Sequence, residues 1–110
     1  MERYVFVGEE RSELARTKGW RWEDGRLAAK QLFDALRVNG IEPTDQVYVN
    51  IFEGDEIPEG TVVGMGRRVQ AELDKRGIEH KSIIHPAARG KIRNKELYAK
   101  HIGEQLKKTK

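Results

Sequence analysis

The sequence predicts an α/β fold, a three-layer sandwich built on a mainly parallel four-stranded sheet. Four short runs rich in β-branched and aromatic residues alternate with longer amphipathic runs, a pattern typical of strands joined by crossover helices. The 110 residues suit one domain spanning 1–110, with a modest core and no need for covalent staples. We expect the basic residues 107–110 to fray.

The composition excludes several classes of protein. The chain has no cysteine, so disulfides, cysteine-ligated zinc and cysteine-held iron–sulfur clusters are ruled out. No apolar run is long enough to span a bilayer, and we expect a cytoplasmic protein with no metal, no other cofactor and no membrane partner. The net charge of +3, with its basic excess toward the C-terminus, mildly favours DNA or a nucleotide as partner. The sequence predicts no particular oligomeric state.

The N-terminal third holds one strand and one clear helix. Residues 4–7 predict the first strand, and residues 11–15 fit either an irregular loop or a short helix. A helix is predicted over 26–39, because apolar residues recur there at helical spacing. Between these elements, Trp20 and Trp22 lie in a glycine-bounded loop, where they either cap the core or bind a base or sugar.

The middle of the chain poses the main question of topology. Strands are predicted over 47–52 and 61–66, and residues 53–60 between them contain a proline but no helix. A parallel crossover usually needs about a dozen residues, although eight extended residues can reach about 26–29 Å. The two strands therefore either run parallel through a bare crossover loop or pair antiparallel. Asn50, the amide in the first of them, is either a core hydrogen-bonding residue or a ligand contact.

The C-terminal half repeats the alternation of helix and strand. Helices are predicted over 67–76 and 94–106, with the fourth strand over 78–84. His101 falls on the inner face of the last helix, at the edge of the core. The fourth strand ends before His85-Pro86, because proline lacks the N–H that a central strand needs.

Polar residues and glycines follow the predicted strands. In a parallel sheet these positions share the carboxyl edge, where open α/β sheets bind their ligands. Glu9, Asn50, the glycine turn 64–66 and His85 would meet there. The loop after His85 adds three basic side chains: Arg89, Lys91 and Arg93. Each feature also has a simpler explanation. The acid and the cations can be solvated surface charges, and the amide and the histidine can form local hydrogen bonds only.

The ordered set of these motifs resembles the uracil-DNA glycosylase superfamily, most closely its thermostable, iron–sulfur-containing branch. That branch has Gly-Glu-Ala-Pro-Gly after the first strand, an asparagine closing the second, and a turn like His-Pro-Ala-Ala after the last. The matching segments cover most of the chain: Val7-Gly8-Glu9, residues 28–41, Val47-Tyr48-Val49-Asn50, Val62-Val63-Gly64-Met65-Gly66 and His85-Pro86-Ala87-Ala88. The resemblance implies a uracil-DNA-glycosylase-like fold.

The resemblance also implies a reaction, the hydrolysis of the bond between a base and deoxyribose in DNA. The base leaves as an anion, which a hydrogen-bond donor in a dry pocket stabilises, and the base must first leave the stack. By this resemblance Glu9 orients water or stabilises the sugar cation, and His85 donates to the departing base oxygen. Asn50 and Trp22 would bind the base. Three cations would bind DNA phosphates: Arg89, Lys91 and Arg93.

The chain departs from that family at several places, and three functions stay open. Glu10-Arg11-Ser12 replaces the family's Ala-Pro-Gly, and the cluster cysteines and the usual segment between the second and third strands are absent. The first function is an enzyme, a DNA glycosylase acting on uracil or another modified base. The second is a non-catalytic module that binds a nucleotide or oligonucleotide on the same fold. The third is a structural or protein-interaction domain, in which Glu9, Asn50 and His85 point away from a common cleft.

Overall fold

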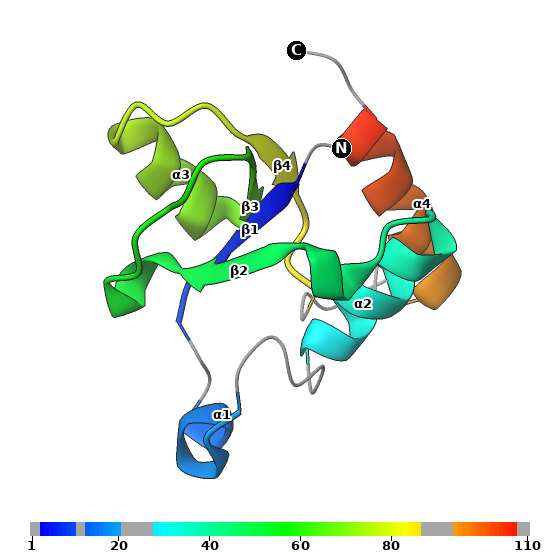
Figure 1. Cartoon of the computed structure of the whole chain (residues 1–110), viewed down its shortest axis with the longest axis horizontal. Helices are drawn as coiled ribbons and strands as arrows, with labels where there is room; N and C mark the ends of the chain where they lie inside the picture. The colour runs from blue at the N-terminus through cyan, green and yellow to red at the C-terminus, as the bar shows by residue number, and fades with distance from the viewer. Residues whose placement is uncertain (1–2, 11–12, 21–27, 87–93, 108–110) are drawn as a thin grey trace.

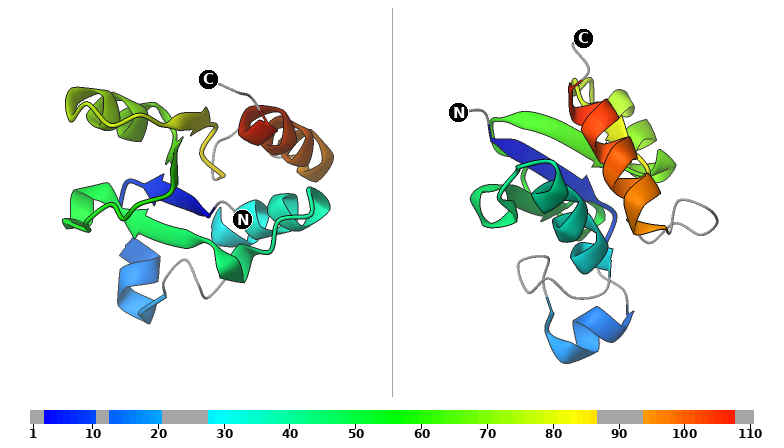
Figure 2. Two further views of the ribbon diagram at one scale, coloured as in Figure 1. Left: turned by 45° about the horizontal axis from the view of Figure 1, so that its top comes forward. Right: turned by 90° about the vertical axis from the view of Figure 1, so that its right-hand side faces the viewer.

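The computed structural model describes residues 3–10, 13–20, 28–86 and 94–107. Four strands form one all-parallel sheet in the order β2-β1-β3-β4: β1 Tyr4–Gly8, β2 Val47–Asn50, β3 Thr61–Met65 and β4 Lys81–Ile83. Four helices accompany it in the described ranges: α1 Glu13–Lys18, α2 Ala28–Val38, α3 Arg67–Lys75 and α4 Lys95–Lys107. Figures 1 and 2 show the sheet between α3 on one face and α2 with α4 on the other. The predicted α/β class and parallel sheet are confirmed.

Alternation along the strands builds the two cores that separate these layers. Phe6 and Val63 are fully buried against α2 and α4, together with Tyr98 and Ile102 of α4. The neighbouring positions point the other way, and Val5, for example, belongs to the core under α3. Strands covered on both faces read as nearly continuous apolar runs, which is why the sequence marked them clearly.

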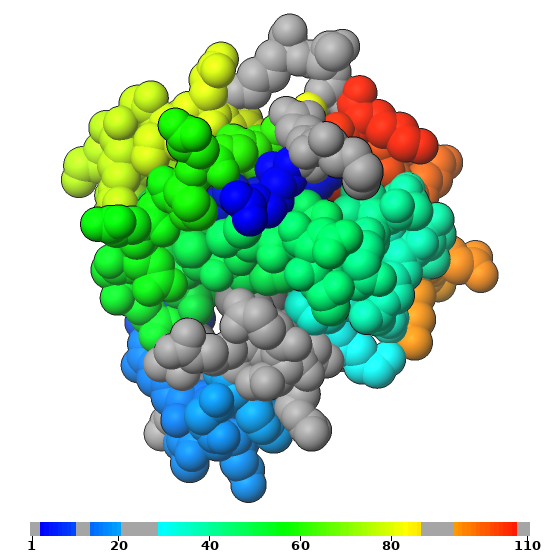
Figure 3. Space-filling model, in the orientation of Figure 1, coloured from blue at the N-terminus to red at the C-terminus, as the bar shows by residue number. Residues whose placement is uncertain are grey.

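The connection from β2 to β3 settles the topology. The two strands are not neighbours, because β1 lies between them and pairs parallel with both. Residues 51–60 carry the crossover without an α-helix, starting with a 3₁₀ turn at Ile51–Glu53 that ends at Gly54 with φ +81. The parallel alternative with a bare crossover loop is therefore confirmed, and the antiparallel alternative is wrong. In the space-filling view, β2 and the turn before it run as a band across the middle of this face (Figure 3).

Several predicted boundaries need correction. The strand predicted over 47–52 ends at Asn50, because the backbone turns into the 3₁₀ helix Ile51–Glu53, in which the Phe52 N–H bonds to the Glu9 carbonyl oxygen at 2.9 Å. The strand predicted over 61–66 ends one residue early, because Gly66 has φ +90. The strand predicted over 78–84 shrinks to three residues.

The helices differ from their predicted ranges by one or two residues in the described parts. Residues 11–15 were open between loop and helix, and the short helix α1 begins at Glu13. The helix predicted over 26–39 is seen as Ala28–Val38, its first two predicted residues lying outside the described ranges. The last helix begins after Asn94, whose side-chain oxygen accepts the N–H groups of residues 96 and 97 at 2.9 and 3.2 Å. In the parts of the chain described, no helix is long and apolar enough to cross a bilayer.

Helices α2 and α4 pack side by side in the apolar core, and a polar contact also joins them. The Asn39 side-chain amide donates to the carbonyl oxygen of Ala35, at 2.8 Å, and to that of Ala99 in α4, at 2.9 Å. Gly103 lies one turn further along α4, and a Cβ placed there would collide with the Asn39 side-chain oxygen. The glycine thus lets the two helices approach closely, and this contact fixes α4 beside the sheet.

Candidate functional site

The four strands end in one row. The register places their last residues on one level: Gly8, Asn50, Met65 and Ile83. The residues that follow therefore leave the sheet side by side: Glu9, Ile51, Gly66 and Ile84. With neighbouring strands about 4.8 Å apart, β1 and β4 are separated by about 10 Å and β2 and β4 by about 14 Å. Chemical groups from three strands are thus brought to one edge.

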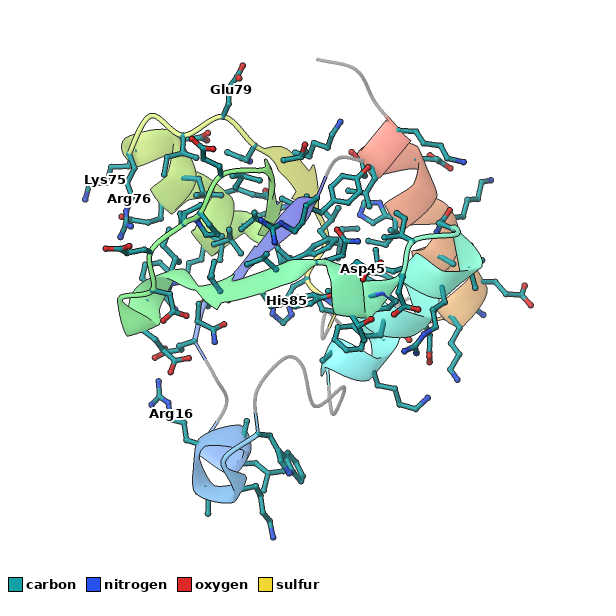
Figure 4. The ribbon with its side chains drawn as sticks, in the orientation of Figure 1. Arg16, Asp45, Lys75, Arg76, Glu79 and His85 are labelled. Atoms are coloured by element: carbon teal, nitrogen blue, oxygen red, sulfur yellow. The ribbon has the colours of Figure 1, made fainter. Side chains whose placement is uncertain are left out.

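His85 lies two residues beyond the end of β4. In Figure 4 it lies near the middle of the molecule, whereas the labelled Lys75 and Glu79 lie at its periphery. Pro86 is buried and restricts the backbone of His85 to an extended conformation. A Cβ on Gly66 would lie 3.4 Å from the His85 Cβ, so the histidine packs against the backbone of the turn after β3.

Burial and charge act on the His85 ring in opposite directions. Burial lowers the pKa of His85, since it disfavours the charged imidazolium, and the Glu9 carboxylate opposes this shift by favouring it. Burial has the larger effect, so the ring is neutral at pH 7 and offers one N–H donor. The influence of Glu9 also indicates that the two predicted catalytic side chains lie within electrostatic reach of each other.

Glu9 is held from the α3 side of the sheet. Its Oε1 accepts from Nη1 of Arg68 at 2.8 Å, with the two side chains 33% and 67% exposed. The Arg68 guanidinium in turn lies 4.7 Å from the centre of the Phe52 ring. The backbone of Phe52 closes the arrangement by bonding to Glu9, so one acid, one cation and one aromatic ring form a small cluster beside the strand ends.

Asn50 is a buried amide at the edge strand, 8% exposed. Its backbone N–H donates to the Asp55 carboxylate at 2.8 Å, which satisfies a donor that points away from β1. This contact ties the start of the crossover loop back to β2 and fixes the backbone from which the Asn50 side chain projects. Its side-chain amide carries both a donor and an acceptor, and it is the buried polar side chain at the end of this strand.

The peptide before His85 is bound by α4. The hydroxyl of Tyr98 donates to the Ile84 carbonyl oxygen at 2.8 Å, and the Ile84 N–H donates to Nε2 of His101 at 2.9 Å. The preceding carbonyl, of Ile83, accepts both the Gly66 N–H and the Gln70 side-chain amide at 3.0 Å. The turn that carries His85 is therefore fixed from α3 and from α4.

The structure brings together part of the predicted site. Glu9, Asn50 and His85 lie at the same sheet edge, as the parallel arrangement predicted. Trp20 is half-buried after α1. Four predicted site residues fall outside the described ranges: Trp22, Arg89, Lys91 and Arg93.

Sequence reasoning missed the residues that hold this edge in place. Arg68 could have been noticed, because two arginines directly follow the glycine turn at the start of a helix, where the dipole favours acids. Phe52 was missed because the predicted strand over 47–52 included it, whereas β2 ends at Asn50. The sequence places His101 on the inner face of its helix, as the structure has it, but no pattern in the sequence predicts its hydrogen bond with Ile84.

The groups at this edge are suited to hydrogen bonding. A neutral imidazole N–H, a carboxylate and a buried amide lie at one edge, and between them they offer both donors and acceptors. Among the residues described, no three His, Asp or Glu side chains gather to hold a metal ion. Hydrogen bonding and general acid–base chemistry are what these groups can supply.

No protein-family model matches the chain. A search of curated proteins likewise finds no significant match. The residues at the sheet edge and their geometry are therefore what indicates the function.

Proposed function

We propose that this chain recognises a nucleobase at the carboxyl edge of its sheet, as a compact, cysteine-free relative of the uracil-DNA glycosylase superfamily. The proposal depends on one observation above all: Glu9, Asn50 and His85 end or follow three different strands of one parallel sheet at the same edge. The motif order that resembles that family supports the same conclusion.

The spacing and chemistry of the edge fit a pyrimidine such as uracil. The backbones of β2 and β4 are about 14 Å apart, and beyond the ends of β1 and β3, which lie between them, an asparagine, a single ring and a histidine would span that distance. Uracil presents an N–H between two carbonyl oxygens, and an amide can accept from the first while donating to one of the others. In this pose Asn50 reads one edge of the base and His85 donates to the remaining carbonyl oxygen.

The reaction we propose at this edge is hydrolysis of the base–deoxyribose bond. The bond breaks with its electron pair leaving on the base nitrogen, and the neutral His85 N–H stabilises the resulting anion. Water adds to the sugar carbon, and Glu9 orients that water and takes its proton. The phosphates of the DNA would be held by Arg89, Lys91 and Arg93, as the resemblance implies.

A non-catalytic nucleotide-binding module is the second candidate, and one observation favours it. Arg68 neutralises Glu9 through a direct ion pair, so the carboxylate that hydrolysis would use is already engaged. A base could still bind between Asn50 and His85 without any bond being broken.

One assay separates these functions. The purified protein is incubated with uracil-containing single- and double-stranded oligonucleotides, and abasic sites are then cleaved with alkali. Cleavage that is lost in His85→Ala and in Asn50→Asp, but kept in the matched control His80→Gln, supports hydrolysis. Saturable binding without cleavage, weakened by Asn50→Asp, supports the binding module. Folded protein that neither cleaves nor binds any nucleotide or oligonucleotide overturns both.

A further inference from the structure

The position of each group that would touch a base depends on the backbone that carries it. The backbone before His85 is held by side chains of α4. The peptide N–H and C=O of Ile84 lie beyond β4, where no further strand pairs with them in the described sheet. Two side chains of one helix bind both groups. The Tyr98 hydroxyl donates to the carbonyl at 2.8 Å, and His101 Nε2 accepts from the N–H at 2.9 Å.

These contacts act directly on the residue that follows. Fixing the peptide of Ile84 fixes the amide plane from which His85 continues, and Pro86 limits the backbone on its other side. The Gly66 backbone lies beside the His85 Cβ, so close that a Cβ on Gly66 would lie 3.4 Å from it. Rotation of the chain at Ile84 would carry the His85 ring away from Glu9 and out of its buried position.

The two side chains have different roles: Tyr98 is a hydrogen-bond donor and His101 is an acceptor. An imidazole nitrogen that accepts a hydrogen bond carries no proton, so the proton of the neutral His101 ring is on Nδ1. Tyr98 is buried, and burial raises the pKa of its hydroxyl, so it stays a donor throughout the working pH range. A helix-face histidine that only filled the core edge would show no such preference for one tautomer.

We propose that Tyr98 and His101 are positioning residues for His85, and that His101 acts in this way as its Nδ1–H tautomer. The inference rests on the proposed function only where base cleavage is concerned. The bonds to Ile84 and their effect on the His85 ring are independent of any ligand, and they can be tested on the protein alone.

The test is NMR of the imidazole rings, which is practical because the chain has three histidines. Long-range nitrogen–proton spectra report the tautomer of each ring, and pH titration gives the pKa of His85. We expect His101 in the Nδ1–H form. In His101→Ala the turn is released and exposed, so the lowered pKa of His85 rises toward its ordinary value of 6.5. His101→Gln keeps an acceptor oxygen at a similar reach and leaves the His85 titration near that of the wild type.

Two further variants keep the test decisive if His101→Ala does not fold. Tyr98→Phe removes the donor to Ile84 but keeps the ring in the core, and it should move the His85 titration in the same direction. His80→Gln is the matched control, because His80 bonds to Asp74 at the other end of β4 and should leave His85 unaffected. A wild-type His101 in the Nε2–H tautomer, or a His85 titration unmoved by both His101→Ala and Tyr98→Phe, overturns the inference.

Base cleavage, if present, adds a second readout. His101→Ala should lower the cleavage rate by about 10- to 100-fold, as a displaced catalytic group does, and His101→Gln should restore most of it. If the NMR effects appear and no base is cleaved or bound, the proposed function fails while the positioning role of the two residues stands.

Discussion

Exchanging Gly103 for alanine should have opposite effects on stability in two backgrounds, because of the side chain of Asn39, directly after α2. In the wild type the new methyl group collides with the Asn39 side-chain oxygen, so Asn39 must turn away and give up its two hydrogen bonds to α2 and α4. Each is worth about 1 kcal/mol. Alanine gains about 0.5–1 kcal/mol over glycine in a helix interior. The net result is a loss of about 1 kcal/mol.

The same exchange in Asn39→Ala meets no oxygen and loses no hydrogen bond. Only the helix gain remains, so Gly103→Ala should stabilise that background by about 0.5–1 kcal/mol. The sign therefore reverses, and the coupling energy between the two sites equals the two lost hydrogen bonds, about 2 kcal/mol.

Urea unfolding of the four proteins measures this cycle. With a slope of about 2 kcal/mol per molar, Gly103→Ala lowers the midpoint by about 0.5 M in the wild type and raises it by about 0.3–0.5 M in Asn39→Ala. Equal shifts of the same sign in both backgrounds would refute the contact as the reason for the glycine. A changed slope would show instead that the unfolded or native ensemble has changed.

Three predictions concern the site itself. Because burial lowers the pKa of His85, the unfolded chain binds protons that the folded chain does not. The free energy of unfolding should therefore fall as the pH drops below about 6.5. Urea unfolding at a series of pH values measures this, and His85→Asn should reduce the fall. Glu9→Gln should lower the pKa of His85 further, because the carboxylate is the charge that favours the imidazolium; NMR titration checks this, and a higher pKa in that variant would contradict it. Since the Glu9–Arg68 pair is partly exposed, the same variant should change the unfolding free energy by less than about 1 kcal/mol.

The fold was largely predictable because local patterns and global packing agree. The central strands β1 and β3 are covered on both faces, so each appears as an apolar run, and glycines at Gly40 and Gly77 close α2 and α3 with positive φ. The boundaries were less predictable because neighbours decide where a ladder stops. Phe52 continues an apolar run that is typical of a strand, but it lies in the 3₁₀ turn Ile51–Glu53, where its N–H bonds to the carbonyl oxygen of Glu9, 43 positions earlier.

Site residues could be predicted only where they end or follow a strand, because that position alone places them at the sheet edge. Glu9, Asn50 and His85 follow from the rule that parallel strands share a carboxyl edge. Arg68 and His101 act through partners 59 and 17 positions away, one a carboxylate and the other a backbone amide. Neither side chain carries a mark in the sequence that separates it from an ordinary surface arginine or helix-face histidine.

The two catalytic candidates are supported by opposite layers of the molecule. Glu9 is held by Arg68 of α3, while the peptide before His85 is held by Tyr98 and His101 of α4, with the sheet between the two supports. The two supports are not fully separate, because Gln70 of α3 also donates to the Ile83 carbonyl oxygen two residues before His85. Substitutions at Arg68 and at His101 therefore reach the same pair of groups through contacts on opposite faces of the sheet.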